Sequence, residues 1–201
     1  IVLTDTGSVP SGASPAWAGR LRSAVRQSLL EWHRCTMKHI WSPWRMAYIE
    51  NHNPEPGCLL CNRIAEADGP QNLILHRAQH AFAILNRYPY TNGHMMIVPF
   101  AHRASLDDLS PDALSELMLL LARALTVLRR AYGAEAFNVG ANIGEAAGAG
   151  VVGHVHLHVL PRWPGDTNFM TTTADTRVIS SSLESTYDRL RAIWIEIGAS
   201  S

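Results

Sequence analysis

The sequence predicts an α+β domain: about five strands in a mainly antiparallel sheet, one long central helix and a C-terminal helix. Short apolar runs recur between turn residues, as in antiparallel strands, and residues 154–161 alternate between two faces. Two longer segments instead carry apolar residues at helical spacing. A chain of 201 residues, 47% of them hydrophobic and 17% charged, can bury one compact core. We therefore expect a single globular domain.

Residues 1–36 are expected to form an extension outside this domain. The segment begins rich in Ser, Pro, Gly and Thr, and its second part carries arginines against the single acid Glu31. An amphipathic, arginine-rich and acid-poor segment is typical of a targeting leader, whereas a poorly ordered extension upstream of Met37 is the other interpretation. Both interpretations remain open, and residues 37–201 are taken as the domain.

Residues 37–99 predict an arm followed by three strands. The arm opens with several aromatic residues and continues as a loop punctuated by Pro and Gly, which carries Cys58 and Cys61. Strands are then predicted at residues 73–76, 81–86 and 94–99. Asn92 and Gly93 are a strong turn signal between the last two strands, so the three should form an antiparallel meander.

A long helix is predicted over residues 111–132. Ser110 supplies an N-cap, Pro111 a first position with fixed φ, and Asp112 a charge that suits the helix dipole. The leucines at helical spacing mark the face that we expect to be buried: Leu114, Leu117, Leu121, Leu125 and Leu128. Gly133 is expected to end the helix.

The remainder of the chain predicts two more strands and a second helix. The strands are expected at residues 137–142 and 154–161, with a loop of small residues at 144–153 between them. Ser181 and Glu184 have the spacing of a capping box at the start of the C-terminal helix. The expected buried side of this helix comprises Leu183, Tyr187, Leu190 and Trp194.

Histidine alternates with apolar residues at positions 154–158, the most informative segment of the chain. The two-residue period of a strand places His154, His156 and His158 on one face, roughly 6.5 to 7 Å apart. This spacing resembles that of successive groups in a phosphate chain. Three neighbouring imidazoles are costly to bury unless each has a polar partner, so a structural role needs three separate sets of hydrogen bonds. Metal ligation or phosphoryl chemistry meets the same demand more simply.

Imidazole chemistry suits transfer at phosphorus. An unperturbed pKa of about 6.5 leaves much of a histidine neutral at about pH 7, and neutral imidazole is a competent nucleophile. Glycines lie just upstream, at Gly144, Gly148, Gly150 and Gly153. They would let backbone N–H groups approach a phosphate closely, or they form a plain connector.

The pattern His-φ-His-φ-His-φ-φ that begins at His154 resembles the signature of the histidine-triad (HIT) family of nucleotide hydrolases and transferases. Residues 41 to about 195 are similar to the bacterial branch related to diadenosine tetraphosphate phosphorylases. The segments that carry the likeness are Trp41 to Met46, Asn86 to Tyr90 and Pro161 to Trp163. The resemblance implies a HIT-like fold, a nucleotide substrate, and a homodimer with a continued sheet.

The resemblance also implies roles for single residues. His156 would be the catalytic nucleophile, while His158 and His94 would stabilise the phosphate and position the nucleophile. Asn86 would contact the ribose or nucleoside. Asn142 would touch the bridging oxygen or the phosphate.

The small-residue loop departs from the family pattern. Many members carry Ser or Thr shortly before the first triad histidine, but residues 148–153 offer no hydroxyl. Activation of the leaving group would then come from Asn142, from the substrate's own acidity, or from backbone N–H groups such as those of Gly148 and Gly150. Trp163 either packs in the fold or meets a base or a distal phosphate.

Cys58 and Cys61 form a thiol pair with a two-residue spacing, which usually binds zinc when two more nitrogen or sulfur donors are available. In zinc-containing relatives the other donors correspond to His102 and His154. The resemblance therefore implies a structural Zn²⁺ on these four residues, which would hold His156 in register. A redox pair or two unligated thiols are the alternatives.

Composition limits the partners and the location that we expect. Lys plus Arg and Asp plus Glu both number 17, so the formal net charge is zero and we expect no nucleic-acid partner. No run of about 18 apolar residues is present, so we expect no membrane span. Three cysteines do not make the even-numbered pattern of a small secreted domain, which favours the cytoplasm.

These observations predict an enzyme whose catalytic domain is residues 37–201. It would cleave the phosphoanhydride of a dinucleoside polyphosphate or a related nucleoside phosphate through a nucleotidyl intermediate on His156. The acceptor would be water or phosphate, and no organic cofactor is expected. Two alternatives remain: a zinc-organised nucleotide-binding module without turnover, and a metal-dependent hydrolase that uses the triad as ligands.

Overall fold

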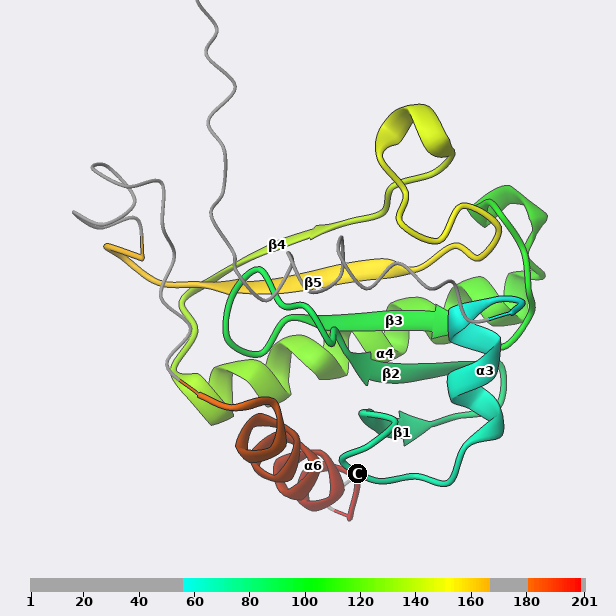
Figure 1. Ribbon diagram of the computed structural model, residues 1–201. Coiled ribbons are helices and arrows are strands. Elements are labelled where there is room, and N and C mark those ends of the chain that lie inside the picture. Colours follow the sequence, from blue (N-terminus) through cyan, green and yellow to red (C-terminus); the bar gives the residue numbers. More distant parts are fainter. Residues whose placement is uncertain (1–55, 167–180, 200–201) are drawn as a thin grey trace, which may run out of the picture. The chain divides into compact units, whose positions relative to one another are not determined.

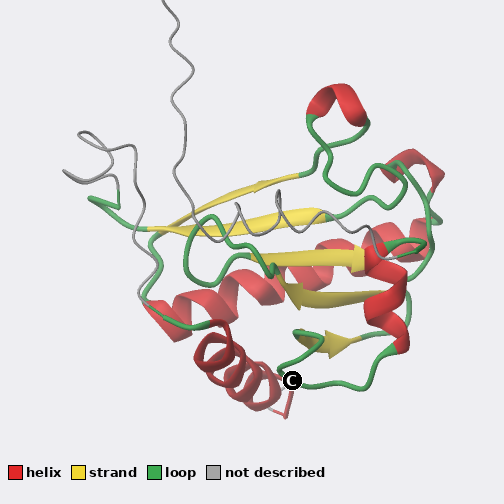
Figure 2. Cartoon of the chain, in the orientation of Figure 1, coloured by secondary structure: helices red, strands yellow, loops and turns green. Residues whose placement is uncertain are grey.

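The structure, a computed structural model, describes residues 56–166 and 181–199. Its main elements are α3 (Leu59–Ala65), β1 (Ile74–Arg77), β2 (Ala81–Leu85), β3 (Met95–Pro99), α4 (Pro111–Tyr132), β4 (Ala136–Gly140), β5 (Leu157–Arg162) and α6 (Leu183–Ala199) (Figures 1 and 2). Short 3₁₀ turns lie at Leu106–Asp108 and Glu145–Ala147. The extension expected at residues 1–36 lies outside the described residues, and so does the opening of the arm at Trp41 to Met46.

The five strands form one sheet in the order β1-β2-β3-β5-β4, and every neighbouring pair is antiparallel. The predicted meander of the first three strands is therefore confirmed. The strand that carries His158 lies between β3 and β4, where Met96 and Gly140 face His158 in the two ladders. The central position of β5 places the end of the histidine segment in the middle of the fold.

The loop between β2 and β3 needs glycine at position 93. Gly93 has a φ of +73°, and a Cβ there would lie 2.9 Å from the Leu128 side chain of α4. The turn signal of Asn92 and Gly93 is thus correct, although it closes a long loop instead of a two-residue hairpin. Close contact between this loop and α4 holds the start of β3 against the helix.

Helix α4 has the predicted ends but a different buried face. Ser110 Oγ accepts a hydrogen bond from Ala113 N at 3.3 Å, and Gly133 ends the helix in the left-handed region. Leu114, expected to be buried, is 36% exposed. The buried side chains are Ala113, Leu117, Leu120, Leu121, Ala124, Val127, Leu128 and Ala131. The alanines belong to the core face because small side chains let the helix approach β2, β3 and β5 closely.

Helix α6 packs against α4 and β1 and buries Thr186, Tyr187, Leu190 and Trp194 (Figure 1). The predicted capping box is displaced by one residue: Ser182 Oγ, instead of that of Ser181, accepts a hydrogen bond from Ser185 N at 3.2 Å. No helix among the described residues is long and apolar enough to span a bilayer.

Helix α3 lies where the sequence predicts only a loop. Cys58 occupies its N-cap position, and Cys61 lies in its first turn. Arg77 of β1 holds the C-terminal end of this helix, because its guanidinium donates to the carbonyl oxygens of Ile64 at 2.9 Å and Glu66 at 3.2 Å. The same guanidinium pairs with Asp68 at 2.8 Å. The expected arm is therefore a short helix anchored to the edge of the sheet.

Candidate active site and metal site

The histidine segment keeps its two-residue alternation, but it is not wholly a strand. Strand β5 begins at Leu157, so the prediction of a strand from residue 154 is wrong for its first three residues. Pairing with β3 stops at Leu157, and Val155 N donates instead to Arg103 O at 2.7 Å. The apolar positions 155, 157 and 159 still enter the core, as predicted.

The imidazoles lie closer together than the spacing of strand positions suggests. The ring centroids of His156 and His158 are 4.8 Å apart at an interplanar angle of 73°, because the rings meet edge to face. His156 is only 6% exposed. The site is therefore a compact, largely buried group of rings.

The tautomer of neutral His156 is set by one backbone contact. Its Nδ1 lies 2.9 Å from the carbonyl oxygen of His154, and a carbonyl oxygen can only accept. Nδ1 therefore carries the proton in the neutral ring, and Nε2 keeps its lone pair. A lone pair on Nε2 is what a nucleophile at phosphorus requires.

His94 and His158 form a hydrogen-bonded pair beside His156. His94 Nε2 lies 2.9 Å from His158 Nδ1 across the β3–β5 ladder. Burial, and then the nearby His156, lower the pKa of His158 from 6.5 to about 4. His158 is therefore neutral at neutral pH and keeps one N–H group to donate.

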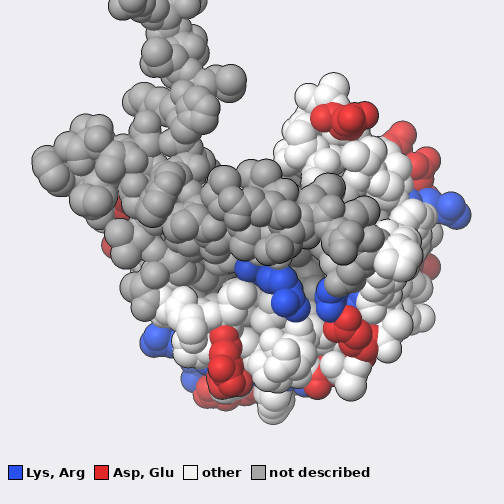
Figure 3. All heavy atoms as spheres, viewed as in Figure 1, with Lys and Arg blue, Asp and Glu red and all other residues white. Residues whose placement is uncertain are grey.

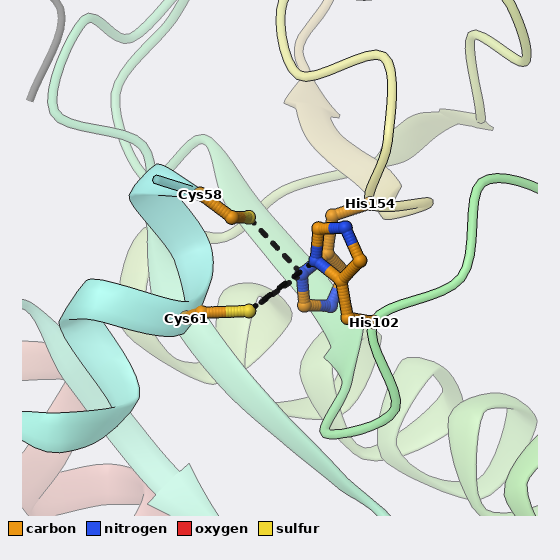
Figure 4. A group of neighbouring side chains, drawn as sticks. All are labelled: Cys58, Cys61, His102 and His154. Carbon is orange, nitrogen blue, oxygen red and sulfur yellow. Dashed lines mark hydrogen bonds between the residues drawn. The ribbon is translucent and has the colours of Figure 1, made fainter. Parts of the chain in front are cut away.

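Two cysteines and two histidines meet on the other side of the segment (Figure 4). Cys58 and Cys61 point from α3 toward the rings of His102 and His154, and the four ligand atoms all lie within 4.8 Å of one another. His154 Nδ1 is 3.4 Å from the Cys58 sulfur and 3.5 Å from the Cys61 sulfur. The four residues predicted as metal ligands are thus brought together.

The donor atoms match a tetrahedral metal site. Ordinary Zn–S and Zn–N bonds at tetrahedral angles put sulfur and nitrogen about 3.5 Å apart, close to the distances found. His154 Nε2 donates to the carbonyl oxygen of Pro99 at 2.9 Å, so Nδ1 faces the sulfurs with its lone pair. Burial and the neighbouring Cys58 raise the pKa of the Cys61 thiol, which a bound cation would offset.

The residues expected to contact the nucleotide are more dispersed. Asn86 lines a small hollow beside His94, and its Oδ1 accepts a hydrogen bond from Tyr88 N at 2.8 Å. Asn142 donates to Gly148 O at 3.4 Å, so within the described residues its amide braces the glycine loop. Gly148, with a φ of +79°, and Gly150 are both exposed.

Trp163 and its neighbour have structural partners. The indole N–H of Trp163 donates to the carbonyl oxygen of Tyr132, the last residue of α4, at 3.0 Å. The Arg162 guanidinium pairs with Asp166 and donates to Asn138 Oδ1 at 2.8 Å. These contacts secure the end of β5 to α4 and β4.

Tyr90 belongs to the segment Asn86 to Tyr90 that carries the resemblance, but no role was predicted for it. Its ring stacks on His94, with centroids 5.0 Å apart and planes inclined by 22°. An aromatic residue four positions before a candidate histidine, in a turn that contains proline, was the available signal.

Known proteins resemble this chain in sequence. A model of the HIT domain matches residues 68–165. An AP-4-A phosphorylase of Mycobacterium tuberculosis is 33% identical over 169 residues, which cover 80% of this chain and 86% of that protein. A bis(5'-nucleosyl)-tetraphosphatase (asymmetrical) of Schizosaccharomyces pombe is 27% identical over 122 residues, or 61% of this chain and 63% of that protein.

Solved structures give the same result for the fold. The crystal structure of a Zn-bound histidine triad family protein from Mycobacterium smegmatis has a TM-score of 0.59 and 26% identity. It covers 72% of this chain and 98% of that one. The antiparallel sheet with its long helix is therefore shared with proteins of this kind, and the predicted fold class is confirmed.

Proposed function

The chain belongs to the HIT domain family, and we propose that it cleaves a phosphoanhydride of a dinucleoside polyphosphate or a related nucleoside phosphate through a covalent intermediate on His156. Relatives named as a phosphorylase and as a tetraphosphatase support a nucleotide-processing enzyme. Water or phosphate accepts the nucleotidyl group in the second step.

The observation that carries this proposal is the lone pair on His156 Nε2. It follows from the 2.9 Å contact between His156 Nδ1 and His154 O, because a carbonyl oxygen only accepts and the proton of the neutral ring therefore lies on Nδ1. A neutral, fixed ring needs no base to remove a proton before it attacks. In its neutral form His156 therefore has the tautomer and the orientation that a nucleophile requires.

The chemistry takes two displacements. In the first, the Nε2 lone pair forms a bond to phosphorus, and the P–O bond to the leaving phosphate chain breaks with its electron pair on oxygen. In the second, an oxygen of water or phosphate bonds to phosphorus, the P–N bond breaks, and its electron pair returns to Nε2. A proton that the attacking oxygen loses passes to solvent. His158, neutral beside the reacting ring, donates a hydrogen bond to a phosphate oxygen, and His94 holds His158 in place.

The nucleotide itself would be held by residues on two sides of the triad. Asn86, next to His94, contacts the ribose or nucleoside. Gly148 and Gly150, which lack side chains and lie exposed, offer backbone N–H groups to phosphate oxygens. Asn142 braces this loop and faces the bridging oxygen, while the Trp163 ring packs near a base.

A structural Zn²⁺ would be held by Cys58, Cys61, His102 and His154. When bound, it supplies a fixed cross-link and no reacting ligand, since four protein donors close a tetrahedral site. The residues around it do the positioning: His154 binds through its ring and accepts from His156 through its carbonyl oxygen. Zinc on His154 would thus fix the proton acceptor that orients the nucleophile.

The alternative function, a metal-dependent hydrolase, requires the three triad histidines to bind the catalytic metal. Within the described residues, the metal-compatible group takes only His154 from the triad, and His156 and His158 lie outside it. Because the metal-compatible group does not include His156 and His158, covalent catalysis is favoured over attack by metal-activated water.

An assay of turnover distinguishes the proposed enzyme from a nucleotide-binding module that catalyses no reaction. The assay measures products from a panel of dinucleoside polyphosphates, each with and without inorganic phosphate. We expect His156→Ala to lower the rate by about 10⁴-fold or more, with His80→Ala as a control because His80 lies outside the site. Turnover that is unchanged in His156→Ala would refute the proposal, and nucleotide binding without product in the wild-type protein would establish the module.

A further inference from the structure

The loop before β3 reaches the catalytic group through Tyr90. The main-chain N–H of Tyr90 donates to His94 Nδ1 at 3.2 Å, and its ring stacks on the same imidazole. The Tyr90 ring also lies 6.5 Å from the ring of His158. His94 is only 1% exposed, so the Tyr90 ring forms part of its cover. Two independent contacts from one residue therefore restrain His94.

These contacts determine where the protons lie. An N–H group can only donate, so His94 Nδ1 must offer a lone pair to Tyr90. Neutral His94 then carries its proton on Nε2 and donates it to His158 Nδ1 across 2.9 Å. His158 Nδ1 is an acceptor in turn, which places the proton of His158 on Nε2. The backbone donor at Tyr90 therefore selects the tautomer of both histidines in sequence.

We propose that Tyr90 is a positioning residue, whose backbone N–H and stacked ring hold His94 so that His158 presents an Nε2–H donor next to His156. The proposal rests on the function proposed above, because the donor matters only if a phosphate reacts there. A His94 ring rotated by a half turn would put the C–H groups of Cδ2 and Cε1 where Nδ1 and Nε2 now lie, so both hydrogen bonds would be lost. Fixing the ring removes this unproductive state before substrate binds.

The loop that carries Tyr90 is built to aim this N–H group. Asn86 Oδ1 accepts from Tyr88 N at 2.8 Å, which folds the chain into a local turn. Pro89 follows, buried, and its ring restricts the backbone on both sides. His94 N then donates to Thr91 O at 3.1 Å, which closes the loop on itself. The donor and the imidazole are thus held by the same short segment.

Histidine tautomers are read directly by ¹⁵N NMR of the wild-type protein without substrate. We expect the Nε2–H form for both His94 and His158, and the opposite Nδ1–H form for His156. An Nδ1–H form of His94 would overturn the proposal. This measurement needs no variant, so it decides the matter even if a substitution at Tyr90 prevents folding.

Two variants separate the ring from the hydroxyl of Tyr90. Tyr90→Ala keeps the backbone N–H but removes the stacked ring, and we expect kcat to fall about tenfold with KM changed less than about twofold. In this variant the His94 and His158 resonances should show mixed or exchanging tautomers. Tyr90→Phe keeps the ring and should restore both kcat and the single tautomers. Wild-type kcat and tautomers in Tyr90→Ala would overturn the role of the ring.

A result that overturns the role of Tyr90 can be distinguished from one that overturns the proposed function. If the wild-type protein forms no nucleotidyl intermediate on His156, the proposed function falls, whatever the tautomers are. If the intermediate forms but His94 carries its proton on Nδ1, the function stands and the role of Tyr90 falls.

Discussion

His154 takes part in two sites at once. Its ring faces the Cys58 and Cys61 sulfurs through Nδ1 and donates to Pro99 O through Nε2. Its carbonyl oxygen, which is independent of the ring, accepts from His156. A proposed ligand of the metal site is therefore also the hydrogen-bond partner of the proposed nucleophile, so a change at one site is expected to affect the other.

Replacing the exposed member of the four metal-site residues tests the proposed metal site. His102 is exposed, and its Nδ1 lies 3.4 Å from the Cys61 sulfur. We expect His102→Ala to lose most of its zinc, measured by elemental analysis, and to melt at a lower temperature than the wild type. His80→Ala is the control and should keep both. Full zinc content in His102→Ala would contradict the assignment of this ligand.

His158 makes the stability of the domain depend on pH. Its pKa falls from 6.5 to about 4 in the folded chain, mainly because burial disfavours the charged ring. The unfolded chain therefore binds an additional proton between these values, so stability is present above about pH 6.5 and is lost as the pH falls toward 4.

Thermal unfolding of His158→Asn checks the sign of this effect. The variant should show a shallower loss of melting temperature than the wild type between about pH 6.5 and pH 4. Some slope should remain, because burial also lowers the pKa of His154. Equal slopes in the two proteins would mean that His158 titrates normally.

Glu116 of α4 joins this helix to the turn between β1 and β2. Its carboxylate accepts hydrogen bonds from three successive backbone N–H groups, those of Gln79, His80 and Ala81. Charge-assisted bonds of this kind are stronger than neutral ones, and their loss would leave partly buried donors without an acceptor.

We expect Glu116→Ala to lower the free energy of unfolding by about 2 kcal/mol, measured by urea denaturation. Glu116→Gln keeps an acceptor oxygen and should lose about half as much. The control Glu135→Ala changes an exposed glutamate and should stay within about 0.5 kcal/mol of the wild type. A similar stability for Glu116→Ala and the control would contradict the role of this carboxylate.

The sequence predicts the type and order of the elements better than their boundaries and faces. Five strands and two long helices were predicted from short apolar runs between turn residues and from helical spacing. Burial alternates regularly only along β5, whereas β2 is buried throughout and β4 is mostly exposed. Helix α3 was missed because its seven residues are too short for periodicity and follow a Pro/Gly-rich loop. The face of α4 was displaced because a search for leucines overlooks alanines such as Ala124, which is fully buried.

The candidate site, too, could be predicted only in part. Spacing and resemblance predicted which residues gather, and the structure brings the four metal-site residues together and pairs His94 with His158. Protonation states could not be predicted, since they depend on acceptors distant in sequence, such as Pro99 O for His154. The contact between β1 and α6 was not predicted either: the ring of His76 stacks on that of the buried Trp194, with centroids 5.6 Å apart.

The domain presents a mixed surface and a sheet that ends at β4 in the described part of the chain. Acidic and basic side chains are interspersed on the face drawn in Figure 3, in keeping with a net charge of zero. Val139 of β4 is 46% exposed, and Met118 and Leu119 of α4 are 57% and 70% exposed. We propose that a second copy covers these residues and continues the sheet, as the resemblance implies.

Size-exclusion chromatography with light scattering tests the dimer. A lysine on an edge strand opposes pairing with another strand, so Val139→Lys should shift the wild-type dimer toward the monomer. Val152→Lys, at an equally exposed position outside the strands, is the control and should remain dimeric. A monomeric wild-type protein would refute the proposed assembly.

The identity of the nucleophile is tested most directly by rapid quenching of the enzyme with a dinucleoside polyphosphate, followed by peptide mass spectrometry. We expect an acid-labile nucleoside monophosphate adduct on His156, joined through Nε2, and no adduct in His156→Ala. Rapid turnover with an adduct on another residue, or with none trapped at any time, would contradict the assignment of His156 as the nucleophile.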